Sequence, residues 1–285
     1  MSNLVLGSGS FLGNSFLKFL ENRQEKVFGA SSYHIENSDN ILITDYSFEA
    51  IENIIYKIKP RFIFDFKSPI VSSDKESYAN KTIEQFVEPT KNIVNCLKNI
   101  KGFNSHVTLI SSNLLNNKKY SEHPYVKIKS EQERLYLGLN NKFLKKNILR
   151  IPAVIGIGDL NFNRLLPFIM GNYLLNKEIQ LNSNKETVRE YITIHQLFEL
   201  LILRSETFEF SYSYTNNQIV DQISSILKEK GLEKLKLNWN NKVNNNEINK
   251  SQSMDVSFKN NLENVVEWYL ENSDYVKKSF LNFNF

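Results

Sequence analysis

The sequence predicts an α/β protein with a doubly wound parallel sheet and a smaller C-terminal α+β lobe. Over the first 155 or so residues, short apolar runs alternate with segments of helical periodicity. Near-continuous apolar strands that alternate with helices are typical of a parallel sheet covered on both faces. A glycine-rich turn stands between the first strand and the first helix. In the remaining residues the alternation stops.

The predicted elements of the first part follow one another without internal repeats. In the segment SFEAIENIIYKI, apolar residues recur at spacings of three and four, which predicts one buried helical face. The strands are predicted at 4–6, 26–30, 41–43, 62–66, 107–111 and 148–151. The helices are predicted at 11–23, 47–58, 78–98 and 123–146.

The second part mixes helices with a few short strands. A polar, turn-rich run at 238–253 predicts a surface loop. We expect residues 1–155 to form the sheet domain and residues 156–285 to form mostly a substrate-binding lobe, with some segments returning to the sheet. Its helices are predicted at 163–175, 194–204, 216–229 and 258–280, and its strands at 178–181 and 209–214.

Composition excludes several classes of protein. Apolar residues make up 41% of the 285-residue chain, enough for a sizeable core. No apolar run has the length of a membrane span, and MSNLVLGSGS reads as a first strand and not as a signal peptide. The net charge of +4 is dispersed, without the basic stripe of a nucleic-acid reader. With Cys96 as its one cysteine, the chain has no multi-cysteine metal site, and we expect a cytoplasmic protein without metal.

The glycine-rich turn follows the first predicted strand and opens the first predicted helix. Glycine tolerates the backbone angles of a tight turn, and its missing Cβ lets backbone N–H groups approach a phosphate. The helix N-terminus adds free N–H groups and the positive end of the helix dipole. The segment therefore predicts a Rossmann-type dinucleotide site, formed by Gly7, Gly9, Ser10, Phe11, Leu12 and Gly13.

Two Tyr-x-x-x-Lys pairs are candidates for proton transfer, Tyr125/Lys129 and Tyr173/Lys177. Residues at this spacing lie on one face of a helix. A free phenol has a pKa near ~10, and a neighbouring ammonium lowers it. The tyrosine can then exchange a proton with a substrate oxygen near neutral pH.

Context favours the first of these pairs. Pro124 precedes Tyr125, and a predicted strand ending in Ser111–Ser112 lies shortly upstream, an arrangement that resembles the active-site helix and strand of the extended short-chain dehydrogenases/reductases. Tyr173 has no such strand before it. We therefore interpret Tyr173 as part of an ordinary helix surface.

Together these segments resemble the extended short-chain dehydrogenases/reductases, the NAD-dependent epimerase/dehydratase family. The turn resembles the family's Gly-x-x-Gly-x-x-Gly loop, with Ser10 in place of the middle glycine. PYVKIKSEQE resembles its Pro-Tyr-x-x-x-Lys-x-x-x-Glu helix. VEPTKNIVNC, LRIPAVIGIG and VREYITIHQL resemble further family segments in the family's order. The resemblance covers most of the chain.

The resemblance implies a catalytic set of Ser112, Tyr125 and Lys129. Tyr125 is expected to exchange the proton with the substrate and Lys129 to hold the nicotinamide ribose, and both residues are expected to contact the bound cofactor. Ser112 is expected to orient the substrate oxygen, with Ser111 as the alternative if the alignment slips by one residue. The residues expected on the substrate side are Ser111, Asn113 and Arg189, the last as a contact to a nucleotide phosphate.

The cofactor is predicted to be NADP, with NAD as the alternative. The second strand ends without the acid that usually holds the ribose 2′-OH of NAD, and Ser31 and Ser32 stand there instead. Asp45 resembles the family's adenine-contacting aspartate, but it is equally interpreted as a cap of helix 47–58. FDFKSP departs from the family's usual His/Asn-Leu-Ala-Ala and brings two charged residues near the cofactor, Asp65 and Lys67. A solvated charge at the strand end is the alternative for the lysine.

The resemblance implies a nucleotide-activated sugar as substrate. Asn113 and Leu114 follow Ser112 where the family's sugar dehydratases carry an Asp-Glu pair, which disfavours dehydration. We expect 4-ketoreduction with NADPH, with 4-epimerisation by a retained NAD as the alternative. A dinucleotide-binding regulator without catalysis is a third hypothesis. The family commonly forms homodimers through the helices that correspond to 78–98 and 123–146.

Overall fold

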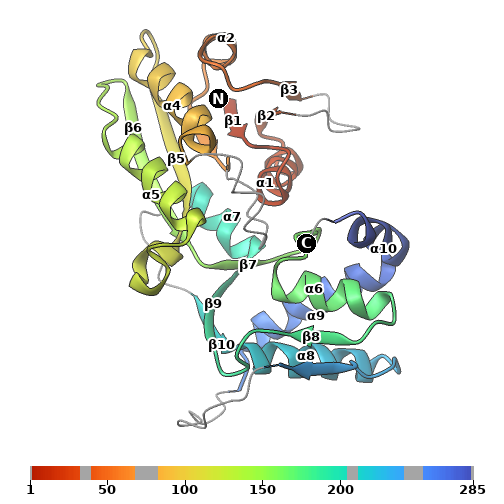
Figure 1. The fold of residues 1–285 in the computed structure, drawn as a ribbon. Coiled ribbons are helices and arrows are strands. Elements are labelled where there is room, and N and C mark those ends of the chain that lie inside the picture. The colour runs from red at the N-terminus through yellow and green to blue at the C-terminus, as the bar shows by residue number, and fades with distance from the viewer. Residues whose placement is uncertain (1, 33–39, 68–82, 204–210, 241–252, 284–285) are drawn as a thin grey trace. The chain divides into compact units, whose positions relative to one another are not determined.

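The computed structural model describes residues 2–32, 40–67, 83–203, 211–240 and 253–283. The chain divides into two compact units (Figure 1). The first comprises Met1–Ile151 with Ile202–Thr207, and the second comprises Pro152–Leu201 with Phe208–Phe285. The first unit contains the parallel sheet.

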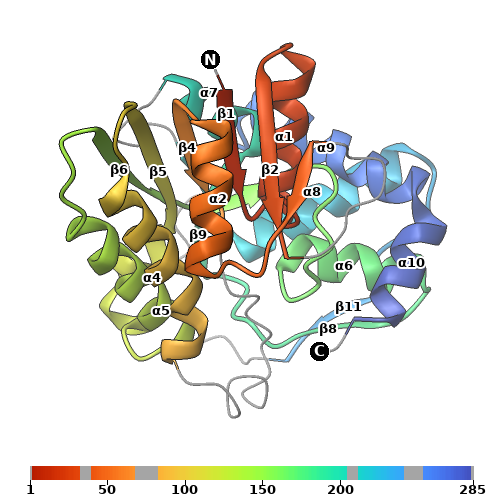
Figure 2. The same cartoon turned by 90° about the horizontal axis from the view of Figure 1, so that it is seen from above.

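This sheet has six strands in the order β3-β2-β1-β4-β5-β6, and each strand runs parallel to its neighbours. Helices α2, α4 and α5 lie along one face and α1 lies on the other (Figure 2). The predicted doubly wound α/β fold is therefore confirmed. The elements are β1 (Ser2–Leu6), α1 (Phe11–Asn22), β2 (Lys26–Ser31), β3 (Ile41–Ile43), α2 (Phe48–Ile58), β4 (Phe62–Asp65), α4 (Ile83–Asn99), β5 (Ser105–Ser112), the 3₁₀ turns η1 (Asn113–Asn116) and η2 (Lys118–Tyr120), α5 (Pro124–Leu137) and β6 (Leu144–Ile151).

Helix α2 illustrates how local sequence signals produce these elements. It begins after Ser47, whose side chain accepts the N–H of Ala50 and satisfies one of the unpaired donors of the first turn. Its predicted apolar face is buried through Ile51, Ile54 and Ile55. The helix therefore packs onto the sheet along the stripe that its periodicity predicts.

Two boundaries of the first unit differ from the prediction. Helix α5 ends at Leu137, not near residue 146, and β6 begins already at Leu144. In the connection, the side-chain amide of Asn141 donates to the carbonyls of Leu97, Lys98 and Ile100, which fixes a turn where the sequence pattern continues a helix. The start predicted for the preceding helix, 78–82, lies outside the described residues.

The second unit surrounds a core that includes Phe162, Ile169 and Phe258. The predicted helix 258–280 is two helices, because the chain turns at Asn272, whose side chain and backbone N–H both donate to the carbonyl of Trp268. Strands β7, β9 and β11 were not predicted. The predicted loop at 238–253 begins within β11, and its residues 241–252 lie outside the residues that the structure describes. The elements are β7 (Ala153–Ile155), α6 (Leu165–Leu174), β8 (Ile179–Leu181), β9 (Val188–Thr193), α7 (Ile194–Leu203), β10 (Tyr212–Thr215), α8 (Asn216–Glu229), β11 (Leu237–Trp239), α9 (Val256–Glu271) and α10 (Ser273–Leu281).

Long-range pairing forms the strands of this unit. β9 pairs with β7 in parallel and with β10 in antiparallel orientation, and β11 pairs with β8 in parallel.

Among the described helices of the chain, none is both long and apolar enough to cross a membrane. That residues 1–155 form a dinucleotide-binding domain and residues 156–285 mostly a substrate-binding lobe stays a prediction.

Candidate functional site

The glycine-rich turn lies between β1 and α1, as expected. Gly7 has a φ of +75°, and a Cβ there would lie 2.8 Å from the backbone nitrogen of Lys67. A Cβ on Gly13 would lie 2.9 Å from the carbonyl carbon of Gly7 and closer still to its oxygen. The turn therefore requires glycine at both positions.

Ser10 explains why the middle glycine of the loop is dispensable in this chain. It is the N-cap of α1, and its hydroxyl accepts the N–H of Gly13 at 3.1 Å. The same hydroxyl donates to the carbonyl of Gly7 at 2.8 Å, so it links the two ends of the turn. Its φ of −77° is one that any residue adopts. Ser10 closes the loop through its side chain.

The N-terminus of α1 suits the pyrophosphate of a dinucleotide. Phe11 and Leu12 occupy its first two positions, where backbone N–H groups have no intrahelical partner. The positive end of the helix dipole lies at the same place and favours an anion. Because Gly7 and Gly13 carry no Cβ, the strand end, the turn and the start of α1 can pack closely in this geometry. The residues present therefore fit the group that the sequence predicts.

Tyr46 anchors the start of this loop, a role that the sequence analysis did not find. It lies three residues beyond β3, next to Asp45, is 2% exposed and has a φ of +59°. Its hydroxyl accepts the N–H of Gly7 at 2.8 Å and donates to the carbonyl of Ala30 at 2.7 Å. Tyr46 therefore joins the glycine turn to the end of β2. A tyrosine after the third strand is too common a feature to have predicted this contact.

The other predicted cofactor residues lie at the ends of neighbouring strands. Ser31 ends β2 and is 1% exposed, whereas Ser32 is exposed. Asp45 is exposed and accepts the N–H of Ser47, which lowers the pKa of its carboxyl. The N-cap of α2 is Ser47 and not Asp45. Asp45 supports the start of the helix only by accepting the N–H of Ser47.

Lys67 lies beside the glycine turn, just beyond β4. Its ammonium lies over the ring of Tyr46, 4.0 Å from the ring centroid, and its side chain is partly buried. Burial lowers the pKa of this ammonium, and the nearby Asp65 carboxylate opposes that effect. Lys67 is therefore not a freely solvated charge at the end of the strand, which was the alternative interpretation of this residue.

The two serines at the end of β5 have different partners. Ser111 is 2% exposed, and its hydroxyl donates to Glu133 Oε1 at 2.6 Å. The hydroxyl of Ser112 accepts the N–H of Leu114 at 3.3 Å, and Asn113 opens the following 3₁₀ turn. Ser111 is therefore committed to a structural contact, which favours Ser112 over its neighbour as the substrate-facing serine.

Helix α5 carries the predicted tyrosine and lysine. His123 is its N-cap and accepts the N–H of Tyr125 through Nδ1, with Pro124 at the first helical position. Tyr125 is partly exposed, whereas Lys129, one turn later, is 2% exposed. The ammonium of Lys129 donates to the carbonyl of Ile110 in β5 at 2.9 Å. Helix α5 thus brings Lys129 against the strand that ends in Ser112.

Lys129 has an unusual electrostatic environment. Burial lowers the pKa of its ammonium to about 8, and the carboxylates of Asp65 and Glu133 oppose that shift. A lysine with this pKa is still mostly charged at neutral pH. The buried side chain of Lys129 therefore carries a positive charge one helical turn from Tyr125.

Glu133 connects α5 to β6. Arg150 binds it with two nitrogens, at 2.9 Å to Oε1 and 2.6 Å to Oε2, and a third nitrogen donates to Asn116 at 2.6 Å. With the hydroxyl of Ser111, the carboxylate of Glu133 has three charged or polar contacts. This network fixes α5 against the ends of β5 and β6.

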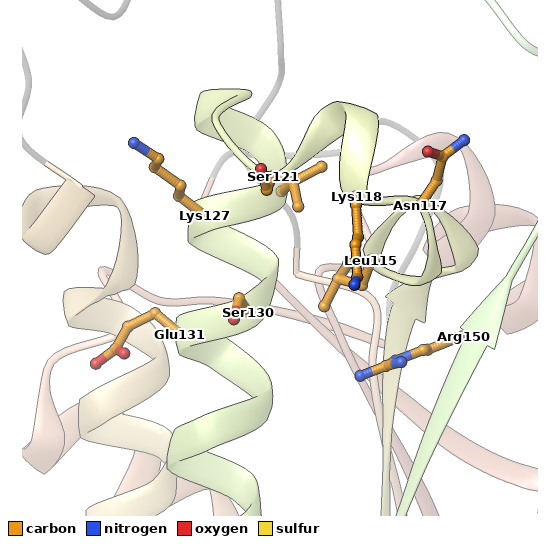
Figure 3. A pocket seen from close by; sticks show the side chains of 9 residues that line it. Leu115, Asn117, Lys118, Ser121, Lys127, Ser130, Glu131 and Arg150 are labelled. Atoms are coloured by element: carbon orange, nitrogen blue, oxygen red, sulfur yellow. The ribbon is translucent and has the colours of Figure 1, made fainter.

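A cavity of about 390 Å³ is lined by residues of α5, of the turns η1 and η2, and of β6 (Figure 3). None of the predicted catalytic or cofactor residues lines it, and it meets the network above only through Arg150. It is therefore a feature separate from the candidate site. The lining residues are Leu115, Asn117, Lys118, Ser121, Val126, Lys127, Ser130, Glu131 and Arg150.

Arg189 lies on β9 of the second unit, where its side chain is exposed and its backbone pairs with Tyr214. The other predicted site residues lie in the first unit, at the carboxyl ends of its strands or at the start of α1 and α5. This is the edge at which ligands bind in open α/β sheets.

Comparisons with known proteins identify the fold. No family model and no curated protein matches the sequence. Among solved structures, the chain is similar to a UDP-glucuronic acid 4-epimerase from Bacillus cereus, with a TM-score of 0.71 and 16% identity over 98% of this chain and 99% of that one. It is also similar to a dTDP-glucose 4,6-dehydratase from Bacillus anthracis, with the same four values.

A third similar structure is a UDP-glucose 4-epimerase from Thermotoga maritima, with a TM-score of 0.68 and 18% identity over 96% of this chain and 100% of that one. The matched proteins are members of the extended short-chain dehydrogenase/reductase family. At these identities the likeness establishes the fold. The fold that the sequence resemblance implies is therefore confirmed.

Proposed function

We propose that this chain is an NAD(P)-dependent oxidoreductase of the extended short-chain type that acts on a nucleotide-activated sugar. One observation carries the proposal: the first unit combines a glycine turn fitted to a pyrophosphate with a buried lysine one helical turn from a tyrosine. Both features belong to the carboxyl-end edge of one parallel sheet. A regulator without catalysis has no need of the second feature.

The chain's own residues have distinct roles in this proposal. Tyr125 exchanges a proton with the sugar oxygen, and Ser112 orients that oxygen by a hydrogen bond. Lys129 lowers the pKa of Tyr125 and holds a ribose hydroxyl of the cofactor. Gly7, Gly13 and the first N–H groups of α1 hold the pyrophosphate. When bound, the nicotinamide supplies or accepts the hydride.

Reduction of a 4-keto sugar with NADPH is the reaction that the sequence favours. The absence of an acid after β2 supports NADP, and Asn113–Leu114 after Ser112 weighs against dehydration. Epimerisation at C4 with a retained NAD is the second candidate. The similar epimerase from Bacillus cereus is described as a complex with UDP-glucuronic acid and NAD, which favours this alternative.

Two further parts of the proposal concern partners. Arg189 is proposed to contact a phosphate of the substrate nucleotide. Helices α4 and α5 are proposed to form a homodimer interface, as the resemblance implies. Sedimentation of the purified protein tests the dimer, and a monomer at micromolar concentration contradicts it.

The decisive experiment separates the two reactions. The nucleotide released from the purified protein is identified by mass spectrometry, and the protein is then assayed with 4-keto-6-deoxy nucleotide sugars and NADPH, and with UDP-hexoses without added cofactor. NADPH oxidation with the keto sugars supports reduction. Turnover without added cofactor, together with co-purified NAD, supports epimerisation. Dinucleotide binding without turnover in either assay contradicts the proposed activity.

The two serines of β5 offer a test of the site assignment. Replacing Ser112 by Ala is expected to lower kcat strongly and to change the free energy of unfolding little. Replacing Ser111 by Ala removes a buried hydrogen bond to a carboxylate and is expected to cost about 1–2 kcal/mol of stability, with a smaller effect on kcat. Urea unfolding and steady-state kinetics measure both. The reverse pattern would exchange the roles of the two residues.

A further inference from the structure

A buried carboxylate lies at the end of β4, close to the catalytic lysine. Asp65 is fully buried, and its Oδ2 accepts the hydroxyl of Tyr136 at 2.7 Å. Its Oδ1 accepts the backbone N–H of Lys67 at 2.8 Å. Burial raises the pKa of this carboxyl, and the two hydrogen-bond donors together with the ammonium groups of Lys129 and Lys67 oppose that rise by favouring the ionised form. The family's usual segment at this place offers no acid.

The topology brings this carboxylate and Lys129 together. Asp65 pairs with Leu109 in the register of β4 and β5, and Lys129 donates to the carbonyl of Ile110, the next residue of β5. Tyr136 and Lys129 lie two turns apart on α5, and both are buried against the strand ends. Helix α5 thus places one side chain on Asp65 and another beside it.

The charges around Lys129 come from two elements. Asp65 on β4 and Glu133 on α5 both favour the charged form of its ammonium. Glu133 also binds Arg150 with both oxygens, so much of its charge is neutralised by that partner. Asp65 has only neutral donors as hydrogen-bond partners, with Lys67 as a second nearby cation. Asp65 is therefore the main negative charge available to a buried ammonium.

We propose that Asp65 is a positioning residue that keeps the ammonium of Lys129 charged and in place, with Tyr136 as the donor that holds Asp65. An isolated ammonium in a dry site loses its proton. A carboxylate beside it restores the charge on which the activation of Tyr125 depends. This inference deepens the proposed function and rests on it only for the role of Tyr125.

The ionisation of Lys129 is measurable without a substrate. In protein labelled with [ε-¹³C]lysine, ordinary lysines titrate near pH ~10.4. The Lys129 signal, assigned by its absence from Lys129→Met, is expected to titrate with a midpoint of about 8. In Asp65→Asn this midpoint is expected to fall by about 1–3 pH units, the effect of losing a close opposite charge. An unchanged midpoint overturns the proposal.

Tyr136→Phe is the matched control. It removes the hydrogen bond between Tyr136 and Asp65 but keeps the carboxylate, so the Lys129 midpoint is expected to shift much less than in Asp65→Asn. An equal shift in both variants would mean that packing and not charge sets the ionisation of Lys129. Because coupling between two charges is reciprocal, Lys129→Met is expected to raise the pKa of Asp65, measured by ¹³C-carboxyl titration. This second measurement stays informative if Asp65→Asn does not fold.

The expected pH dependence of activity follows from the direction in which the pKa of Lys129 changes. Activity that needs a charged Lys129 falls on the alkaline side, through the pKa of its ammonium. In Asp65→Asn that alkaline limb is expected to move to lower pH by the same amount as the midpoint seen by NMR. A reduced kcat with an unmoved limb contradicts a role through Lys129. If no substrate is turned over, the NMR titrations still decide between these outcomes, so the two proposals fail separately.

Discussion

Replacing Tyr125 by Phe is expected to lower kcat by about 10²–10⁴-fold, the usual contribution of a positioned proton donor. The variant loses one hydroxyl on a partly exposed side chain, and the hydrogen bond between its backbone N–H and His123 remains. Its free energy of unfolding is therefore expected to change little, and its affinity for the dinucleotide is expected to fall far less than kcat. Steady-state kinetics with the substrate found in the panel, urea unfolding and dinucleotide titration measure the three quantities.

The second Tyr-x-x-x-Lys pair supplies a matched control. Tyr173 also carries a hydroxyl on a helix, where it donates to the carbonyl of Glu233 at 3.2 Å within the second unit. Tyr173→Phe is expected to leave kcat within about twofold, because that hydroxyl has no place in the proposed chemistry. Full activity in Tyr125→Phe, or an equal loss in both variants, would sink the assignment of Tyr125.

Replacing Gly13 by Ala is expected to destabilise the protein and to weaken dinucleotide binding at least tenfold. In a helix, alanine is normally better than glycine by up to about 1 kcal/mol. At Gly13 the added Cβ meets the carbonyl group of Gly7, and overpacking of this kind costs about 1–3 kcal/mol. The steric cost exceeds the propensity gain, and the turn can yield only by moving the backbone that faces the pyrophosphate.

Gly138, which follows the last residue of α5, provides the control for this substitution. Its φ is −73°, and an added Cβ would lie 3.6 Å from the nearest atoms, an ordinary contact. Gly138→Ala is therefore expected to keep or slightly raise the free energy of unfolding and to leave dinucleotide affinity unchanged. Equal behaviour of the two alanine variants in urea unfolding and calorimetric titration would contradict the steric argument.

Much of the fold could be predicted because its signals are local. The apolar face of α2 and its Ser47 cap both occur within one short segment, and the structure agrees with them. Element ends were less predictable where a distant contact decides them. The apolar pattern continues beyond Leu137, but Asn141 fixes a turn by binding carbonyls around the end of α4. Strands of three residues, such as β7 and β11, form only through their pairing partners.

The candidate site also combines features that could be predicted from the sequence with features that could not. The turn from Gly7 to Gly13 and the pair on α5 are each contained in one stretch of chain, so spacing and context were sufficient to find them. The hydrogen bond between Asp65 and Tyr136 joins residues 71 positions apart, and the contact between Tyr46 and Gly7 spans 39. No pattern in a single sequence encodes such contacts. Both become evident only when the ends of neighbouring strands lie side by side.

The hydrogen bonds that anchor the glycine turn affect the expected entropy of dinucleotide binding. Gly7 and Ser8 donate to Ala30, and the hydroxyl of Tyr46 adds a second acceptor for Gly7. The entry half of the turn is thus preorganised, whereas the N–H groups at the start of α1 remain for the phosphates of the proposed dinucleotide. The conformational entropy of this segment is lost during folding and not on association. A rigid receptor of this kind binds its ligand without a preceding ordering step.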